Sequence, residues 1–92
     1  AEKARRYCRF AVATGYAPFA PHLFFPQFLD DENPDERELG MFMAIIMLTK
    51  CAELWVFGDR ITKGMSQEIR KAESRNMIVR YFTTDCEEVN HA

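Results

Sequence analysis

Residues 54–69, LWVFGDRITKGMSQEI, predict a buried strand, a short polar loop and the start of a helix. In an open α/β sheet, ligands bind beyond the carboxyl ends of the strands, where loops meet helix N-termini. Glycine in such a loop lets the backbone approach a ligand, and the unpaired amides of a first helical turn attract anions. We therefore expect a candidate binding site at this junction.

Glu68 is unusual in the expected helix because it interrupts an apolar stripe. The stripe follows the i, i+3, i+4, i+7 spacing of one helical face and consists of Met65, Glu68, Ile69 and Ala72. We expect Glu68 on the inward edge of the first turn. There it is either a partner of the helix dipole, paired with an arginine, or a working carboxylate.

Two other polar residues follow expected strand ends. Asp59 comes directly after Gly58 and is either a turn-forming residue or a ligand contact. His22 follows a proline at the end of an expected strand, which is the edge where ligands bind. As a lone histidine without a metal-ligand motif, it is either structural or a ligand contact.

The whole chain alternates helical and strand patterns, which predicts parallel strands joined by crossovers. We expect a single α/β domain over residues 1–92: a three-layer αβα, flavodoxin- or Rossmann-like parallel sheet. The apolar run 53–58 is expected at the centre of the sheet, and residues 16–20, which contain Pro18, at its edge. Since the expected order of helices and strands begins with a helix, we expect a first strand to precede this sequence. The expected helices and strands alternate over residues 1–14, 16–20, 34–50, 53–58, 63–75 and 77–83.

The remaining segments carry further expectations. Residues 21–33 are expected to form an aromatic loop that covers either the domain's own core or a ligand, and residues 84–92 a polar tail. Asn33 and Pro34 predict a capped helix start. Within that helix, Met41 to Leu48 (MFMAIIML) is apolar nearly all round, which predicts a helix buried on both sides and hence a homo-oligomer interface.

Composition narrows the class of partner. The chain has 92 residues and a net charge of −2, so neither nucleic acid nor an anionic membrane is expected. Its three cysteines are far apart and fit a reducing cytoplasm, and no apolar run reaches transmembrane length. The acidic run 30–32 is expected to be a solvated turn rather than a metal site, and no cofactor is expected.

Several motifs resemble a small, functionally uncharacterised bacterial and phage family, over most of the chain up to about Phe82. That family resembles in turn a branch of the nucleoside 2-deoxyribosyltransferase-like superfamily, through its order of elements and a Gly-x-x-x-Glu motif at a strand-loop-helix junction. The motifs are residues 4–8 (ARRYC), 20–23 (APHL), 25–31 (FPQFLDD) and 54–61 (LWVFGDRI), with Gly64-Met65 and Glu68-Ile69.

The resemblance implies roles for individual residues. Glu68 would be the nucleophile that attacks C1′ of a deoxyribosyl group, and Gly64, followed by Met65, would open the helix at the sugar or phosphate. Thr62 matches a phosphate-contacting serine of the nucleotide N-hydrolases, which favours a 5′-phosphorylated ligand. Apart from the resemblance, Asp59 lies at the end of the expected strand, where a second carboxylate could bind a sugar hydroxyl or assist proton transfer to the leaving base. Nothing in the sequence matches the aromatic, glycine-rich loop that follows the superfamily's first strand.

Two classes of function follow. The first is an enzyme that hydrolyses the N-glycosidic bond of a nucleoside or nucleotide, or transfers its deoxyribosyl group. The second is a non-catalytic protein that binds a nucleotide-derived ligand or serves as an oligomer-forming partner. Since unrelated functions occur on similar folds, the fold does not decide between them.

Overall fold

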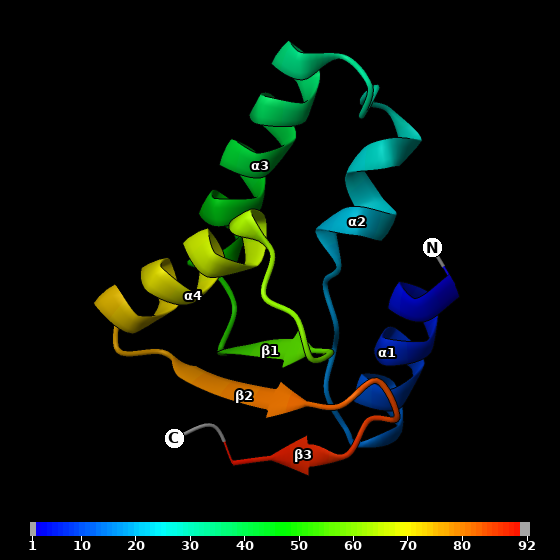
Figure 1. Ribbon diagram of the computed structural model, residues 1–92, viewed down its shortest axis with the longest axis vertical. Helices are drawn as coiled ribbons and strands as arrows, with labels where there is room; N and C mark the ends of the chain where they lie inside the picture. The colour runs from blue at the N-terminus through cyan, green and yellow to red at the C-terminus, as the bar shows by residue number, and fades with distance from the viewer. Residues whose placement is uncertain (1, 91–92) are drawn as a thin grey trace. The chain divides into compact units, whose positions relative to one another are not determined.

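The computed structural model describes residues 2–90 and divides into two compact units, one ending at Phe42 and the other beginning at Met43 (Figure 1). The boundary falls within a helix.

The first unit contains helices and no strand among its described residues. Helix α1 (Glu2–Ala13) buries Ala11, and Gly15 follows it with a φ of +94°. An extended segment leads to α2 (Pro21–Phe24), which is continued by a 3-10 turn, η1 (Phe25–Gln27). The predicted first helix is therefore confirmed, and a left-handed glycine follows its end.

Two predictions are wrong here: the strand over residues 16–20 and the aromatic loop after it. Pro18 has no N–H to donate to a sheet, and no strand pairs with this segment among the residues described. Pro21 occupies the first position of α2 after an extended Ala20 (φ −119°, ψ 106°), so a helix begins where a loop was expected. Phe25 is buried and contacts the ring of Phe24 edge-on, with the ring centres 5.2 Å apart.

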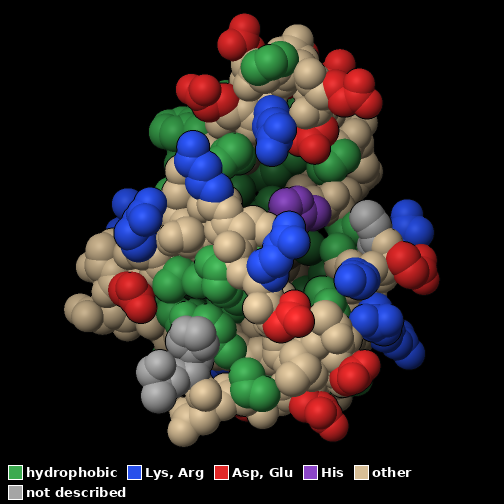
Figure 2. Space-filling view, viewed as in Figure 1, with side chains coloured by type: hydrophobic (Ala, Val, Ile, Leu, Met, Phe, Trp, Pro, Cys, Tyr) green, Lys and Arg blue, Asp and Glu red, His purple; other side chains and the backbone are tan. Residues whose placement is uncertain are grey.

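Helix α3 (Pro34–Leu48) begins as the sequence predicts. The side-chain oxygen of Asn33 accepts hydrogen bonds from the amides of Asp35 (3.0 Å) and Glu36 (3.2 Å). Acidic side chains gather around this helix start (Figure 2). They complement the partial positive charge of the helix N-terminus.

The second unit contains a strand-helix-strand motif. Strand β1 (Glu53–Phe57) is followed by α4 (Lys63–Ser74) and by β2 (Ile78–Phe82). The two strands are parallel, in a register that pairs Glu53 with Ile78 and Phe57 with Phe82. All three elements lie where the sequence predicts them. Asn76, with a φ of 57°, provides the left-handed residue between α4 and β2.

The predicted parallel, three-layer fold is wrong. A third strand, β3 (Glu88–Val89), pairs antiparallel with β2, so the described residues form a mixed sheet in the order β1-β2-β3. Strand β1 therefore lies at an edge of this sheet and not at its centre. The expected polar tail begins with a turn at Cys86 (φ 63°) and continues into β3, while residues 91–92 lie outside the described part.

Aromatic rings and one arginine hold the sheet together. The ring of Phe82, which is 2% exposed, lies 4.8 Å from that of Trp55 and 4.9 Å from that of Phe57. The guanidinium of Arg80 lies 4.8 Å from the centre of the Trp55 ring. Burial of these large rings is the main source of stability in so small a sheet. Val56 and Ala72, both buried, complete the core of the second unit.

Candidate functional site

The loop between β1 and α4 is the predicted site (Figure 1). Gly58 turns the chain away from the sheet with a φ of +103°, which other residues rarely adopt. Its amide donates to the carbonyl of Phe82 at 2.9 Å, which extends the pairing of β1 with β2 by one residue. Asp59 and Arg60 follow and are exposed.

Thr62 caps the start of α4. Its hydroxyl oxygen accepts a hydrogen bond from the amide of Met65 at 3.2 Å, and its own amide contacts the sulfur of Met65 at 3.5 Å. This reciprocal pair is a capping box in which methionine takes the place usually held by glutamate. The cap uses the oxygen of Thr62 as an acceptor and leaves the O–H as a donor for a ligand.

Two amides at the start of α4 have no acceptor in the part of the chain that is described. The amides of Met65 and Ser66 donate to the hydroxyl and carbonyl oxygens of Thr62. The amides of the two preceding residues, Lys63 and Gly64, donate to no described atom. Such orphan donors at a helix N-terminus are a general means of binding phosphate and other anions.

Gly64 is not explained by the structure around it. It has no positive φ, and a Cβ placed on it would meet nothing within 4 Å. A glycine in a helix costs about 0.5–1 kcal/mol relative to alanine. Neither the backbone conformation nor the packing around it therefore requires glycine at this position.

The charge at the start of α4 also departs from what helix stability favours. Its first turn contains no acidic residue, and Lys63 is its first residue. Arg60 precedes the cap by two positions and is exposed, as is Lys63. Cations at the positive end of a helix dipole are unfavourable unless an anion binds there. Neither cation was among the predicted site residues, although Arg60 and Lys63 lie just before and within the expected first turn.

Glu68 lies one turn deeper than predicted. It is the sixth residue of α4 and therefore falls in the second turn. The helix dipole acts mainly within the first turn, so Glu68 lies deeper than a dipole partner usually does. Its pairing with an arginine and its role as a working carboxylate both stay predictions. Glu68 is half-buried, and the stripe to which it belongs ends at the fully buried Ala72. It follows Gly64 by four residues, about 6 Å along the same helical face.

His22 stands separately from the other predicted site residues. It is exposed and lies on α2 in the first unit, whereas Asp59, Thr62, Gly64, Met65 and Glu68 all belong to the second. Its predicted position at a strand end is wrong, because residues 16–20 form no strand. Among the described residues, no group of three or more His, Cys, Asp or Glu side chains could hold a metal ion.

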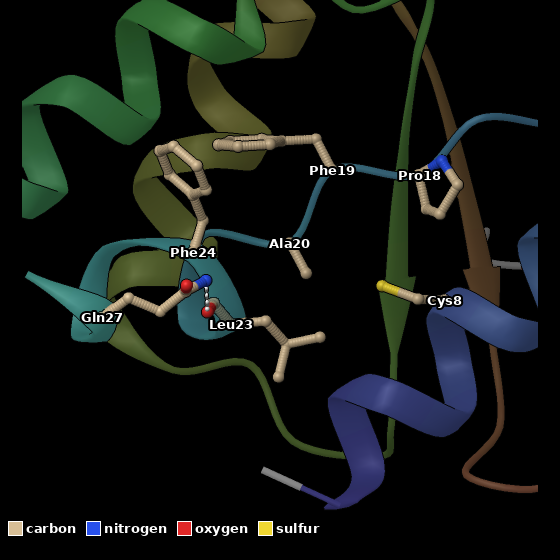
Figure 3. A pocket seen from close by; sticks show the side chains of 7 residues that line it. All are labelled: Cys8, Pro18, Phe19, Ala20, Leu23, Phe24 and Gln27. Atoms are coloured by element: carbon tan, nitrogen blue, oxygen red, sulfur yellow. Dashed lines mark hydrogen bonds between the residues drawn. The ribbon is translucent and has the colours of Figure 1, made fainter.

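The first unit contains a shallow hollow that the sequence did not predict (Figure 3). The side-chain amide of Gln27 in its wall is held by the carbonyl of Leu23 at 3.1 Å. Burial raises the pKa of the Cys8 thiol, so little of it is thiolate at neutral pH. The hollow is mainly apolar and contains no predicted site residue. It has a volume of about 300 Å³ and is lined by Cys8, Pro18, Phe19, Ala20, Leu23, Phe24 and Gln27.

Comparison with protein families matches residues 1–82 to a family described as "Domain of unknown function (DUF7768)". The chain belongs to this family. The matched residues run from α1 to the end of β2 and include the whole β1–α4 junction, whereas β3 lies beyond them. No curated protein and no solved structure matches the chain. A separate structural finding is that, within residues 2–90, no helix is long and apolar enough to cross a membrane.

Proposed function

We propose that the β1–α4 junction binds a 5′-phosphorylated nucleoside and that Glu68 cleaves its N-glycosidic bond. One observation carries the proposal: Gly64, for which neither packing nor backbone conformation gives a reason, opens a helix one turn before a half-buried carboxylate. The resemblance of the Gly64-x-x-x-Glu68 motif to that of nucleoside 2-deoxyribosyltransferase-like proteins supports the same assignment.

The phosphate is assigned to the start of α4. The amides of Lys63 and Gly64 are the hydrogen-bond donors, and the hydroxyl of Thr62 is a third. The exposed side chains of Lys63 and Arg60 supply positive charge. Since Gly64 has no side chain and open space beside it, a phosphate oxygen can reach the backbone directly.

The sugar is assigned to the helical turn that separates Gly64 from Glu68. In the proposed reaction, a carboxylate oxygen of Glu68 attacks C1′ while the bond from C1′ to the base breaks and its electrons pass to the base. A carboxylate at this position also stabilises the oxocarbenium-like transition state. The base takes up a proton from water, and Asp59 binds a sugar hydroxyl or relays that proton. Water then hydrolyses the glycosyl ester, or a second base accepts the sugar.

The test compares the wild type with Glu68→Gln, which removes the nucleophile, and with Glu73→Gln as a matched control. Glu73 is an exposed glutamate on the same helix. Each protein is incubated with a panel of nucleosides and nucleoside 5′-monophosphates, and released base is measured by chromatography. Release by the wild type and Glu73→Gln, with loss in Glu68→Gln, is expected. Equal release by wild type and Glu68→Gln would refute the role of Glu68.

The alternative is a non-catalytic protein that binds the same nucleotide-derived ligand. The observed fold favours this alternative. The resemblance to the enzymes rested partly on the expected order of helices and strands, and that order included a strand at residues 16–20 that does not form. Binding is measured by thermal stabilisation with 5′-monophosphates, and Gly64→Ala is the variant expected to lose it. Binding without base release would establish the alternative. Absence of both would refute a nucleotide site at this junction.

A further inference from the structure

One side of α3 presents large apolar side chains to solvent. Leu39, Phe42 and Ile46 are 46%, 62% and 45% exposed. Their spacing of three and then four residues places them in one stripe along the helix. Although the boundary between the two units falls within α3, the stripe is a feature of this continuous helix alone. Several adjacent, exposed apolar side chains of this size mark an interaction surface.

The two ends of this α3 stripe carry opposite charges. Asp35 precedes Leu39 by four residues, and Lys50 follows Ile46 by four. Both charged side chains are exposed. Lys50 lies just beyond the helix, in a turn in which its amide donates to the carbonyl of Met47 at 2.9 Å. The stripe therefore begins with an acid, continues with apolar residues and ends with a base.

We infer that the α3 stripe pairs with the same stripe of a second copy of the chain, antiparallel, across a two-fold axis beside Phe42. In such an interface, if residue i contacts residue j, then j also contacts i. Antiparallel pairing brings Leu39 against Ile46 of the second copy and Asp35 beside its Lys50, and each contact occurs twice. The parallel arrangement brings acid beside acid and base beside base. The charge pattern thus selects a second copy of this chain, in one orientation.

The shape of the surface supports the same register. A hollow of about 360 Å³ lies along this side of α3, lined by Asp35, Glu38, Leu39 and Phe42. In the antiparallel pair, Ile46 of the second copy faces Leu39 and enters this hollow. Filling it brings Ile46 against Leu39 and Phe42, beside the carboxylates of Asp35 and Glu38, and the two antiparallel helix dipoles attract each other. The inference does not depend on the proposed function of the β1–α4 junction.

The first test is the oligomeric state of the full chain, measured by sedimentation or light scattering over a series of concentrations. Phe42→Glu is expected to convert a dimer to a monomer while leaving the circular dichroism spectrum unchanged, because Phe42 is exposed. Val12→Glu is the matched control, since Val12 is 53% exposed and lies on α1. It is expected to leave the dimer intact. A wild type that is monomeric throughout, or a Phe42→Glu variant that is still dimeric, would overturn the inference.

The second test examines the orientation by charge reversal. Asp35→Lys and Lys50→Asp are each expected to weaken the dimer by roughly threefold to tenfold, because each brings like charges together at two places. The double variant is expected to recover most of the wild-type affinity. Each substitution also destabilises α3 itself, because it places a cation at the N-terminus or an anion at the C-terminus of the helix dipole. Recovery in the double variant therefore cannot come from a more stable helix. A double variant that dimerises no better than the single variants would rule out the antiparallel register.

Discussion

A polar side chain caps the first turn of both α3 and α4, but the residues that follow the cap differ in charge. At α3, Asn33 accepts two amide hydrogen bonds, Pro34 has no N–H to satisfy, and Asp35 and Glu36 follow. At α4, Thr62 accepts one amide, and the two residues after it are a lysine and a glycine. No acid lies in the first turn of α4.

The two sets of side chains suit the two helix starts to different roles. Acids and a proline in the first turn neutralise the helix dipole and leave few donors unpaired, so the start of α3 contributes to folding. A lysine and a glycine in the same positions reduce helix stability and leave two donors available, so the start of α4 is suited to an external anion. The four predictions below follow from this comparison.

The largest expected effect is at the α3 cap. Asn33→Ala removes the acceptor of two amides and is expected to lower the free energy of unfolding by about 1–2 kcal/mol. Thr62→Ala removes the acceptor of one amide and is expected to cost about 1 kcal/mol. Urea denaturation measures both, with Asp31→Ala in the preceding turn as a control. A larger loss for Thr62→Ala than for Asn33→Ala would contradict the comparison.

Next in size is the effect of Gly64→Ala, which separates stability from binding. The variant is expected to raise the free energy of unfolding by about 0.5 kcal/mol, because alanine favours a helix and the space is open. It is also expected to weaken binding of a nucleoside 5′-monophosphate, because the new methyl group blocks the backbone. Urea denaturation and thermal stabilisation measure the two effects.

Gly40 in α3 provides the matched glycine for that experiment. A Cβ placed on it would lie 3.4 Å from Cδ1 of Leu29, so packing gives a reason for this glycine. Gly40→Ala is therefore expected to gain less stability than Gly64→Ala and to leave nucleotide binding unchanged. If Gly64→Ala gained stability without any loss of binding, Gly64 would have no role in recognising a ligand.

Local patterns predicted the elements that surround the candidate site. Strand β1 is a short apolar run, α4 has an apolar stripe, and Asn76 ends the helix in a left-handed conformation. Each of these signals lies within a few residues of the structure that it predicts. The alternatives for Glu68 were also visible in the sequence. The observed helix start places Glu68 in the second turn of α4, and both alternatives stay predictions.

The arrangement of the strands was not predictable in the same way, because pairing depends on residues far apart in the sequence. Residues 16–20 contain strand-forming tyrosine and phenylalanine, but Pro18 and Pro21 prevent regular pairing. Strand β3 contains only Glu88 and Val89, and the turn before it requires a φ of 63° at Cys86. No local pattern signals such a turn, since residues other than glycine, asparagine and aspartate rarely adopt that conformation.

A smaller effect is expected from reversing the charge at the start of α4. Lys63→Glu places an acid at the positive end of the dipole and is expected to stabilise the protein by roughly 0.3–1 kcal/mol. It is also expected to weaken binding of 5′-monophosphates and to reduce the dependence of that binding on salt, since Arg60 remains. Lys71→Glu is the control, because Lys71 lies in the last turn of the same helix, where a cation is favourable. The Lys71→Glu control is expected to destabilise the protein and to retain binding. If Lys63→Glu and Lys71→Glu both stabilised the protein, a helix-dipole effect would be excluded.

The smallest effect concerns a cation whose charge is already paired within the chain. Arg80 contacts the carboxylate of Glu88 at 2.8 Å and that of Glu53 at 3.4 Å, whereas Lys63 forms no ion pair among the described residues. The hydrogen bond from Arg80 lowers the pKa of Glu88 below its ordinary value. The pair therefore adds stability above that ordinary value, and this contribution is lost as the pH falls through the lowered pKa.

Because Glu88 is exposed, the loss is expected to be small and to shift the melting temperature only slightly. Glu88→Gln should flatten the fall in melting temperature below about pH 4.5, the ordinary pKa of a glutamate. Glu87→Gln changes the adjacent exposed carboxylate, which forms no ion pair within residues 2–90, and should leave that fall unchanged. Identical melting curves for the two variants at low pH would mean that the pairing of Arg80 contributes nothing to stability. The structural role of Arg80 would then rest on its contact with the Trp55 ring, a kind of contact that Lys63 does not make within the described part of the chain.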